Sequence, residues 1–188
     1  MPPKARVTKD MVIDAAFEVA RQTGAENISA RTVSEKLNCS TQPVMYHFAT
    51  IEALKKAAYA KADRFHTEYL MNAEPHNIML CIGLNYIRFA VEEPHLFRFL
   101  FQSGFSTKNN FLEMVNSQEL VPIISAMQEA MNLNTEQTKE VFVTLALFVH
   151  GYASIITGHS LEYDEKIIRL HLERVYTGAI LALQEEMK

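Results

Sequence analysis

Apolar positions recur at helical spacing along almost the whole chain. In TKDMVIDAAFEVARQTG (8–24), Val12, Ala16 and Val19 share one face, and Thr8 and Gly24 stand where a helix begins and ends. Similar patterns predict helices over about 30–37, 41–48, 51–73, 76–92, 94–102, 108–131, 135–159 and 163–186. Thr50 stands where it can cap the helix over 51–73, and Pro122 predicts an irregularity in the helix over 108–131. No alternation of apolar and polar residues persists long enough to indicate a strand. The pattern therefore predicts an all-α chain of about nine helices.

Two of the predicted helices are short and follow each other closely. Ser29 precedes ARTVSEKL and Ser40 precedes TQPVMYHF, and a serine in that position commonly caps a helix. Pro43 falls in the first turn of the second helix, where backbone N–H groups have no intrahelical partner. Asn38 lies between them and tolerates the left-handed backbone of a tight turn. Two capped helices about three residues apart have the length of a helix-turn-helix.

The second short helix has one apolar and one polar face. At about 100° per residue, Val44 and Phe48 share a face, Gln42 and Tyr46 point nearly opposite, and Thr41 lies at the N-terminal tip. A helix of this length is not stable alone, so its apolar face must be held by neighbouring helices. This arrangement suits a helix that enters the major groove of DNA with its N-terminal end at the bases. The alternative is a three-helix packing module whose outer face is merely polar.

The side chains around this helix suit contacts with DNA. Gln42 can form two hydrogen bonds with adenine, Thr41 can contact several bases, and Arg31 can donate two hydrogen bonds to guanine. Three more side chains can bind phosphates, which position a protein rather than read sequence: Tyr46, His47 and Lys55. Residues 1–61 carry a net charge of +3 and the remaining residues −7, which favours a polyanion partner for the N-terminal part alone.

The stretch ISARTVSEKLNCSTQPVMYHFATIEAL (28–54) resembles the DNA-binding domain of the TetR family of transcriptional regulators. Members often read close to L-G-V-S-x-x-T-L-Y-x-H-F-x-s-K-e-e-L, and the matching residues here are Leu37, Ser40, His47, Phe48, Glu52 and Leu54. The resemblance covers about residues 8–60 and implies a three-helix domain, residues 1–55, that binds double-stranded operator DNA. The expected DNA contacts are Arg31, Ser40, Thr41, Gln42, Pro43, Met45, Tyr46, His47 and Lys55.

Four departures from the family pattern bear on the turn or on DNA contacts. Asn38 replaces the usual turn glycine, and Pro43 replaces a threonine. Met45 stands where tyrosine is usual and Ile51 where lysine is usual, so two phosphate contacts common in the family are missing. Tyr46 and the lysines at 55 and 56 lie where they can compensate. The rival hypothesis is therefore an effector-binding helical protein whose DNA-binding domain is weakened or lost.

The larger C-terminal part, residues 56–188, resembles one TetR subfamily in YIRFAVEEPHLFRFLFQSG (86–104) and LFVHGYASIITG (147–158). That subfamily has an aromatic-His-Gly stretch, which reads Val149-His150-Gly151 here. The resemblance implies a helical domain that binds a small apolar or amphipathic effector and forms a homodimer through its last two helices. The candidate effector contacts are Tyr86, Phe101, Phe105, Phe111, Met114, Met127 and His150, and the candidate dimer contacts are Leu147, Ile167, Leu170, Val175 and Ile180. For each effector candidate, the alternative is an ordinary core position.

Residues 141–161 contain no charged side chain and are about as long as a membrane span. Threonine, serine, histidine and glycine nevertheless occur at several positions within the segment. We therefore expect a helix buried on nearly all sides, in a core or in a subunit interface, and no membrane partner.

No pattern in the chain indicates catalysis, a metal site or a cofactor. There is no Gly-rich phosphate loop, nucleophile elbow or HExxH, and the single Glu-x-x-His, Glu92 to His95, contains Pro94. The two cysteines lie 42 positions apart, and the start MPPKARVTKD lacks the apolar run of a signal peptide. We therefore expect a cytoplasmic regulator rather than an enzyme: a repressor that an effector releases from its operator.

Overall fold

The computed structural model describes residues 7–72, 78–104, 115–159 and 161–186. Within these ranges the chain forms nine α-helices and two short 3₁₀ helices and no strand, which confirms the all-α prediction. Two compact units are present: residues 1–65 with 95–107, and residues 66–94 with 108–188. The predicted functional boundary at residue 55 falls inside the helix that contributes to both units, and it stays a prediction.

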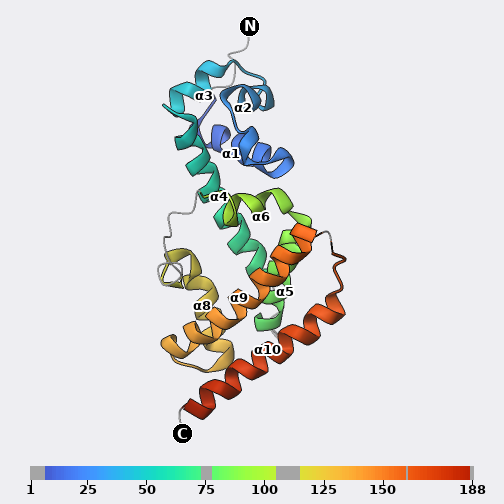
Figure 1. Ribbon diagram of the computed structural model, residues 1–188. Helices are drawn as coiled ribbons and strands as arrows, with labels where there is room; N and C mark the ends of the chain where they lie inside the picture. The colour runs from blue at the N-terminus through green and yellow to red at the C-terminus, as the bar shows by residue number, and fades with distance from the viewer. Residues whose placement is uncertain (1–6, 73–77, 105–114, 160, 187–188) are drawn as a thin grey trace. The chain divides into compact units, whose positions relative to one another are not determined.

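The first unit contains α1 (Lys9–Thr23), α2 (Ala30–Lys36), α3 (Thr41–His47), most of α4 (Ile51–Met71) and nearly all of α6 (Pro94–Phe101). Helices α1, α2 and α3 pack against one another, and the 3₁₀ helix Ala25–Asn27 follows α1 (Figure 1). Their common core consists of apolar side chains that are at most 2% exposed: Val12, Ala16, Ala20, Ile28, Val33, Val44 and Leu54. The predicted helix-turn-helix is therefore formed by α2 and α3.

Side-chain caps explain where three of these helices begin. The hydroxyls of Thr8, Ser29 and Thr50 accept hydrogen bonds of 3.2, 3.1 and 3.1 Å from the backbone N–H three residues later, as predicted. Ser40 also stands at an N-cap position, but its side chain makes no capping hydrogen bond, so that prediction is wrong. The reason is Pro43, which occupies the third helical position and lacks the N–H that a capping serine commonly binds.

Two residues with positive φ follow the first two helices. Gly24 ends α1 with φ 100°, and its N–H donates to the carbonyl of Ala20 at 3.0 Å. Asn38 has φ 50° in the turn between α2 and α3, as the sequence predicts. Since asparagine tolerates this left-handed region, the turn forms without the family's usual glycine.

The second unit contains the end of α4, α5 (Ile78–Glu92), α8 (Val121–Met131), α9 (Thr135–His159) and α10 (Glu165–Glu186). Helix α9 packs against α5, α8 and α10, and α5 also packs against α8 and α10 (Figure 1). Gly83 allows α5 to approach α10 closely, because a Cβ atom there would lie 2.5 Å from Cδ2 of Leu172. The core of this unit includes Leu84, Ile87, Phe89, Ile123, Met127, Val141, Ile168 and Leu172.

The helix expected over 108–131, with an irregularity near Pro122, is interrupted in its described part just before that residue. Helix α8 begins only at Val121, directly after the 3₁₀ helix Gln118–Leu120. Pro122 therefore lies in the first turn of α8. A proline is best tolerated there, because its missing N–H would have had no intrahelical partner.

Helix α9 is less buried than the sequence suggests. Among the described residues, Thr135–Gly158 is the one helix long and apolar enough to cross a membrane by length and composition, which is weak evidence on its own. Only 28% of its most apolar window is buried inside one copy of the chain. The expectation that this helix is buried on nearly all sides within a core is therefore wrong. The alternative that stays open is burial in a subunit interface.

Candidate functional site

Helix α3 presents a polar face and a polar N-terminal end on a buried apolar base. Val44 is fully buried and Phe48, directly after the helix, is 6% exposed, whereas Tyr46 is 78% exposed. Thr41 and Gln42 are exposed at the N-terminal end of the helix. The packing of α1 and α2 against α3 therefore supplies what a seven-residue helix cannot supply for itself.

The other predicted DNA contacts lie close to α3 in the chain with different degrees of exposure. Ser40 is exposed and Met45 is 42% exposed, so a thioether occupies the surface position where family members usually have tyrosine. Pro43 and Lys55 are half-buried.

Arg31 lies on the exposed side of α2 with its guanidinium already paired. Its Nε is 2.9 Å from Oε1 of Glu35, one turn later, and its side chain is 85% exposed. The hydrogen bond and the negative charge of Glu35 raise the pKa of Arg31. Because the ion pair is on the surface, it is weak, and a guanine or phosphate can replace Glu35 as the partner.

His47 makes a contact that the sequence did not predict. Its Nε2 lies 2.9 Å from the carbonyl oxygen of Val7, forty residues earlier, and a carbonyl can only accept, so Nε2–H is the donor. The ring also meets Tyr46 edge-on, with 5.2 Å between the ring centroids. His47 thus ties the segment before α1 to the end of α3.

The predicted effector contacts are divided by the structure. Tyr86 of α5, Met127 of α8 and His150 of α9 all belong to the second unit, whereas Phe101 ends α6 in the first unit and is 37% exposed. Phe105, Phe111 and Met114 lie outside the described residues. Met127 is 1% exposed and is a core residue in this structure.

Tyr86 and His150 are brought together across 64 positions of sequence. The Tyr86 hydroxyl is 2.9 Å from Nδ1 of His150. Burial raises the pKa of Tyr86 and lowers the pKa of His150, so both groups are neutral at pH 7. The tautomer of the imidazole sets which of the two groups donates the hydrogen bond. The pair is an uncharged hydrogen-bonding group between two largely apolar helices.

His66 of α4 is a buried histidine that sequence reasoning missed. Its ring lies edge-on to Phe89 and Tyr86, with centroid distances of 4.8 and 5.4 Å, and burial lowers its pKa to about 3. A signal was present in the sequence, since His66 continues an apolar line with a spacing of four residues. The members of that line are Leu54, Ala58, Ala62, His66 and Leu70, and all are buried.

Acidification should destabilise the fold through His66. The unfolded chain takes up a proton as the pH falls below about 6.5, whereas folded His66 does not until about pH 3. This contribution to stability is complete above pH 6.5 and decreases by up to about 1.4 kcal/mol per pH unit below it. Urea unfolding of the wild type and of His66→Phe between pH 7.5 and pH 4.5 measures the effect. Equal pH slopes for the two proteins would contradict the assignment.

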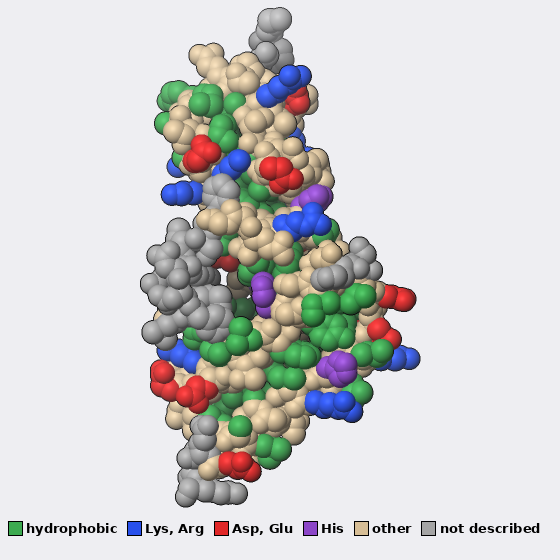
Figure 2. All heavy atoms as spheres, viewed as in Figure 1, with side chains coloured by type: hydrophobic (Ala, Val, Ile, Leu, Met, Phe, Trp, Pro, Cys, Tyr) green, Lys and Arg blue, Asp and Glu red, His purple; other side chains and the backbone are tan. Residues whose placement is uncertain are grey.

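The exposed face of α9 and α10 is apolar and contains small residues. On α9, Leu147 and Ile155 are 58% and 51% exposed, and Gly151 and Gly158 continue the same face at spacings of three and four. On α10, Ile167, Leu170 and Leu181 are 46–55% exposed. Figure 2 shows hydrophobic side chains gathered where α9 and α10 run in Figure 1. We call these seven residues the α9–α10 face.

The predicted dimer contacts are only partly on this face. Leu147, Ile167 and Leu170 belong to it, whereas Val175 and Ile180 are half-buried. The difference follows from helical spacing, because Val175 lies seven residues after Ile168, a core residue of α10.

Comparisons with known proteins agree with the fold. No family model matches the chain. The uncharacterised HTH-type transcriptional regulator YobS of Bacillus subtilis (strain 168) is 21% identical over 175 residues, which cover 89% of this chain and 88% of YobS. A TetR-family member from Streptomyces coelicolor A3 has a TM-score of 0.58 at 21% identity, covering 92% of this chain and 98% of that one. The multidrug binding protein EbrR complexed with ethidium has a TM-score of 0.54 at 19% identity, covering 93% and 99%.

The similarity to these proteins spans both units rather than the helix-turn-helix alone. Coverage of 92% and 93% of the chain is far more than the helix-turn-helix and must extend into both units. The resemblance read from residues 28–54 is thereby confirmed at the level of the whole fold: the chain has the fold of the TetR family of transcriptional regulators.

Proposed function

We propose that the protein is a sequence-specific DNA-binding transcriptional regulator, a repressor that a small molecule releases from its operator. The observation that carries this is the setting of α3, in which Val44 is fully buried and Tyr46 is 78% exposed beside exposed Thr41 and Gln42. A helix whose apolar side is packed against α1 and α2 and whose N-terminal end is exposed suits end-on entry into the major groove. Base edges would be read by Gln42, Thr41 and Arg31.

The residues proposed for phosphate binding surround this reading end. They are Ser40, Tyr46, His47 and Lys55. Pro43 and Met45 would lie beside the DNA backbone as uncharged contacts. Because Nε2 of His47 donates to the carbonyl of Val7, His47 can donate to a phosphate only through Nδ1 of the protonated imidazolium. The net charge of +3 over residues 1–61 favours approach of this part of the chain to DNA.

The C-terminal domain, residues 56–188, would bind the effector and form the homodimer. The Tyr86–His150 pair supports an effector that is mostly apolar and forms one or two hydrogen bonds. EbrR, a multidrug binding protein with a similar fold, forms a complex with the small molecule ethidium, which supports a small-molecule effector here. The α9–α10 face supports pairing of two copies through the last two helices, because its side chains are apolar and exposed in one copy. A cytoplasmic location follows from this function.

Helix α4 is the proposed coupling element. It begins four residues after the end of α3, and its last residues belong to the second unit. An effector lowers operator affinity only if it binds the state that does not bind DNA more tightly.

The experiment that tests the proposal uses the DNA immediately upstream of the gene. Overlapping labelled duplexes are titrated with the full-length protein by fluorescence anisotropy at several salt concentrations between about 50 and 200 mM. Tight binding to one duplex that contains an inverted repeat is expected, with log K falling by about 0.9 per phosphate contact for each tenfold rise in salt. Equal affinity for a shuffled duplex, with little salt dependence, would contradict a sequence-specific regulator.

The second candidate is an effector-binding helical protein with a weakened DNA-binding domain. Two observations favour it. Met45 places an exposed thioether where family members usually have a phosphate-binding tyrosine, and the His47 ring is already hydrogen-bonded to the carbonyl of Val7. This candidate predicts weak binding to every duplex and intact binding of a small molecule, so the same titration separates the two.

Gln42→Ala and Lys55→Ala should have different effects on operator binding. Loss of Gln42 should reduce the preference for the correct base by about 1–3 kcal/mol, because a base contact carries sequence information. Loss of Lys55 should weaken binding to all duplexes about equally and reduce the salt slope by about one. Titrations of both variants against the operator and one mismatched duplex measure the difference, and identical profiles would contradict this division of roles.

A further inference from the structure

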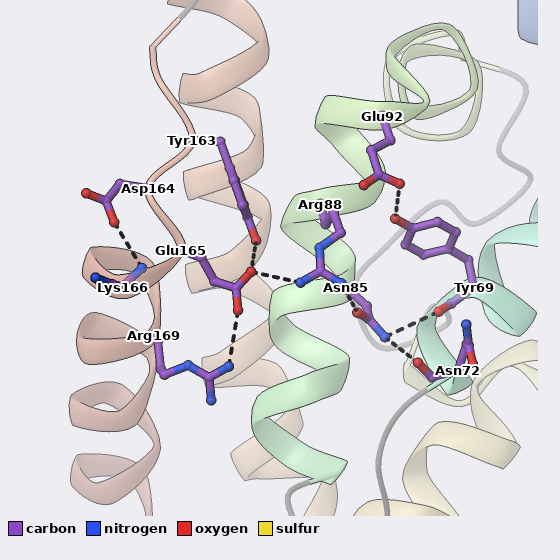
Figure 3. A network of polar contacts seen from close by, with 10 residues as sticks. All are labelled: Tyr69, Asn72, Asn85, Arg88, Glu92, Tyr163, Asp164, Glu165, Lys166 and Arg169. Carbon is purple, nitrogen blue, oxygen red and sulfur yellow. Dashed lines mark hydrogen bonds and ion pairs between the residues drawn. The ribbon is translucent and has the colours of Figure 1, made fainter.

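A group of polar side chains connects the end of α4 with α5 inside the second unit (Figure 3). The amide nitrogen of Asn85 lies 3.4, 3.3 and 3.1 Å from the carbonyl oxygens of Tyr69, Leu70 and Asn72. The last carbonyls of a helix have no intrahelical partner, so Asn85 caps α4 from a neighbouring helix. Asn85 is only 7% exposed, so water has little access to the α4 carbonyls in its place.

Arg88, one turn further along α5, joins this cap to α10. Its Nη1 donates to Oδ1 of Asn85 at 3.4 Å, and its Nη2 donates to Oε2 of Glu165 at 2.8 Å. Glu165 also accepts hydrogen bonds from Arg169 at 3.2 Å and from Tyr163 at 3.4 Å. Figure 3 shows Arg88 between Asn85 on one side and Glu165 on the other.

Arg88 and the carbonyls of α4 require the same orientation of the Asn85 amide. A guanidinium can only donate, so it takes the amide oxygen and leaves the amide NH₂ for the carbonyls of α4. The ion pair itself adds little stability, because the side chains of Arg88 and Glu165 are 37% and 38% exposed. The Glu165–Arg88–Asn85 link therefore acts mainly on the position of the last turn of α4 and little on the stability of the fold.

We propose that Asn85, Arg88 and Glu165 are positioning residues that make the end of α4 depend on the first turn of α10. The proposal rests on the proposed function, in which α4 follows the DNA-reading helix and α10 contributes to the dimer. Glu165 is the first residue of α10, and Ile167 and Leu170 of the α9–α10 face follow it at once. Pairing of two copies orders this turn, Glu165 then orients Arg88, and Asn85 holds α4. Operator affinity thereby becomes sensitive to the state of the dimer interface.

The test compares Arg88→Met with a matched control, Lys139→Met. Lys139 is a partly buried cation of the same unit, with Nζ 2.7 Å from Asn116 Oδ1 and 3.3 Å from Glu136 Oε1, and it lies outside the link. Arg88→Met should speed hydrogen exchange in residues 68–72 by about tenfold, lower operator affinity by about tenfold and leave the dimer dissociation constant unchanged. Lys139→Met should change none of the three.

A double-mutant cycle with Glu165→Gln separates a link from independent stabilisation. Both substitutions interrupt the same chain of contacts, so the double variant should lose no more operator affinity than Arg88→Met alone. Arg88→Lys should not restore affinity, because one ammonium on a flexible stem replaces a rigid guanidinium that donates in two directions.

Additive losses in the double-mutant cycle, or unchanged exchange at 68–72 in Arg88→Met, would overturn the proposal. Absence of operator binding by the wild type would instead refute the proposed function. In that case the exchange measurement still decides whether Arg88 holds the end of α4.

Discussion

Leu147→Glu should prevent the proposed pairing of two copies through the α9–α10 face and leave a monomer. Leu147 is 58% exposed in one copy and lies on the α9–α10 face, four residues before Gly151. In a two-fold interface each patch meets its own copy, so one substitution places two carboxylates in the same apolar contact. Burial of unpaired charges costs several kcal/mol, and the dimer dissociation constant should rise by at least about a thousandfold. Sedimentation velocity over a range of protein concentrations measures the change.

The control for this variant is Ala130→Glu, which adds the same charge at an exposed position of α8. It should leave the dimer dissociation constant unchanged. The Leu147→Glu monomer should also bind an inverted-repeat operator much more weakly, because one monomer can bind only one of the two half-sites. A dimer that survives Leu147→Glu would mean that the copies pair through another surface.

Val44→Asp should unfold the three-helix DNA-binding domain. Val44 is fully buried where α3 meets α1 and α2, and the buried residues that the structure describes there include no cation to pair with a carboxylate. An unpaired buried charge should cost at least about 3 kcal/mol, a large share of the stability of a small domain. Operator binding should be lost, and hydrogen exchange over residues 9–58 should become fast, while α8 to α10 keep their protection.

Met45→Asp is the matched control on the same helix. Met45 is 42% exposed, so its replacement by a carboxylate leaves the charge in water and should change stability by no more than about 0.5 kcal/mol. Operator binding should still weaken, since a negative charge faces the phosphates. The two neighbouring variants thus separate loss of the fold from loss of a contact. Val44→Asp with wild-type exchange would show that α3 does not depend on its buried side.

Several features of the fold could be read from residues close together in the sequence. The caps at Thr8, Ser29 and Thr50 depend on a side chain and an N–H three positions apart, and each was predicted. The turn at Asn38 depends on one residue's backbone preference. The predicted side-chain cap at Ser40 is absent for an equally local reason, since Pro43 has no N–H.

The candidate site was predictable only where it follows from one helix. The division of α3 into buried Val44 and exposed Gln42 and Tyr46 follows from the angle between successive residues. Tyr86 and His150 were each singled out in the sequence, but their hydrogen bond joins residues 64 positions apart. Arg88 and Glu165, 77 positions apart, were not singled out, because a charged residue on a helix gives no sign of its partner.

The sequence by itself determined the helices, the helix-turn-helix and the polar reading face of α3, because each depends on atoms within about one helical turn. Only the tertiary structure decided that α9 keeps an exposed apolar face, that His66 is buried against Phe89 and Tyr86, and that Asn85 contacts both the end of α4 and Arg88. Those contacts depend on how helices distant in sequence pack together. Packing is set by the complementarity of whole helix surfaces, which no local pattern specifies.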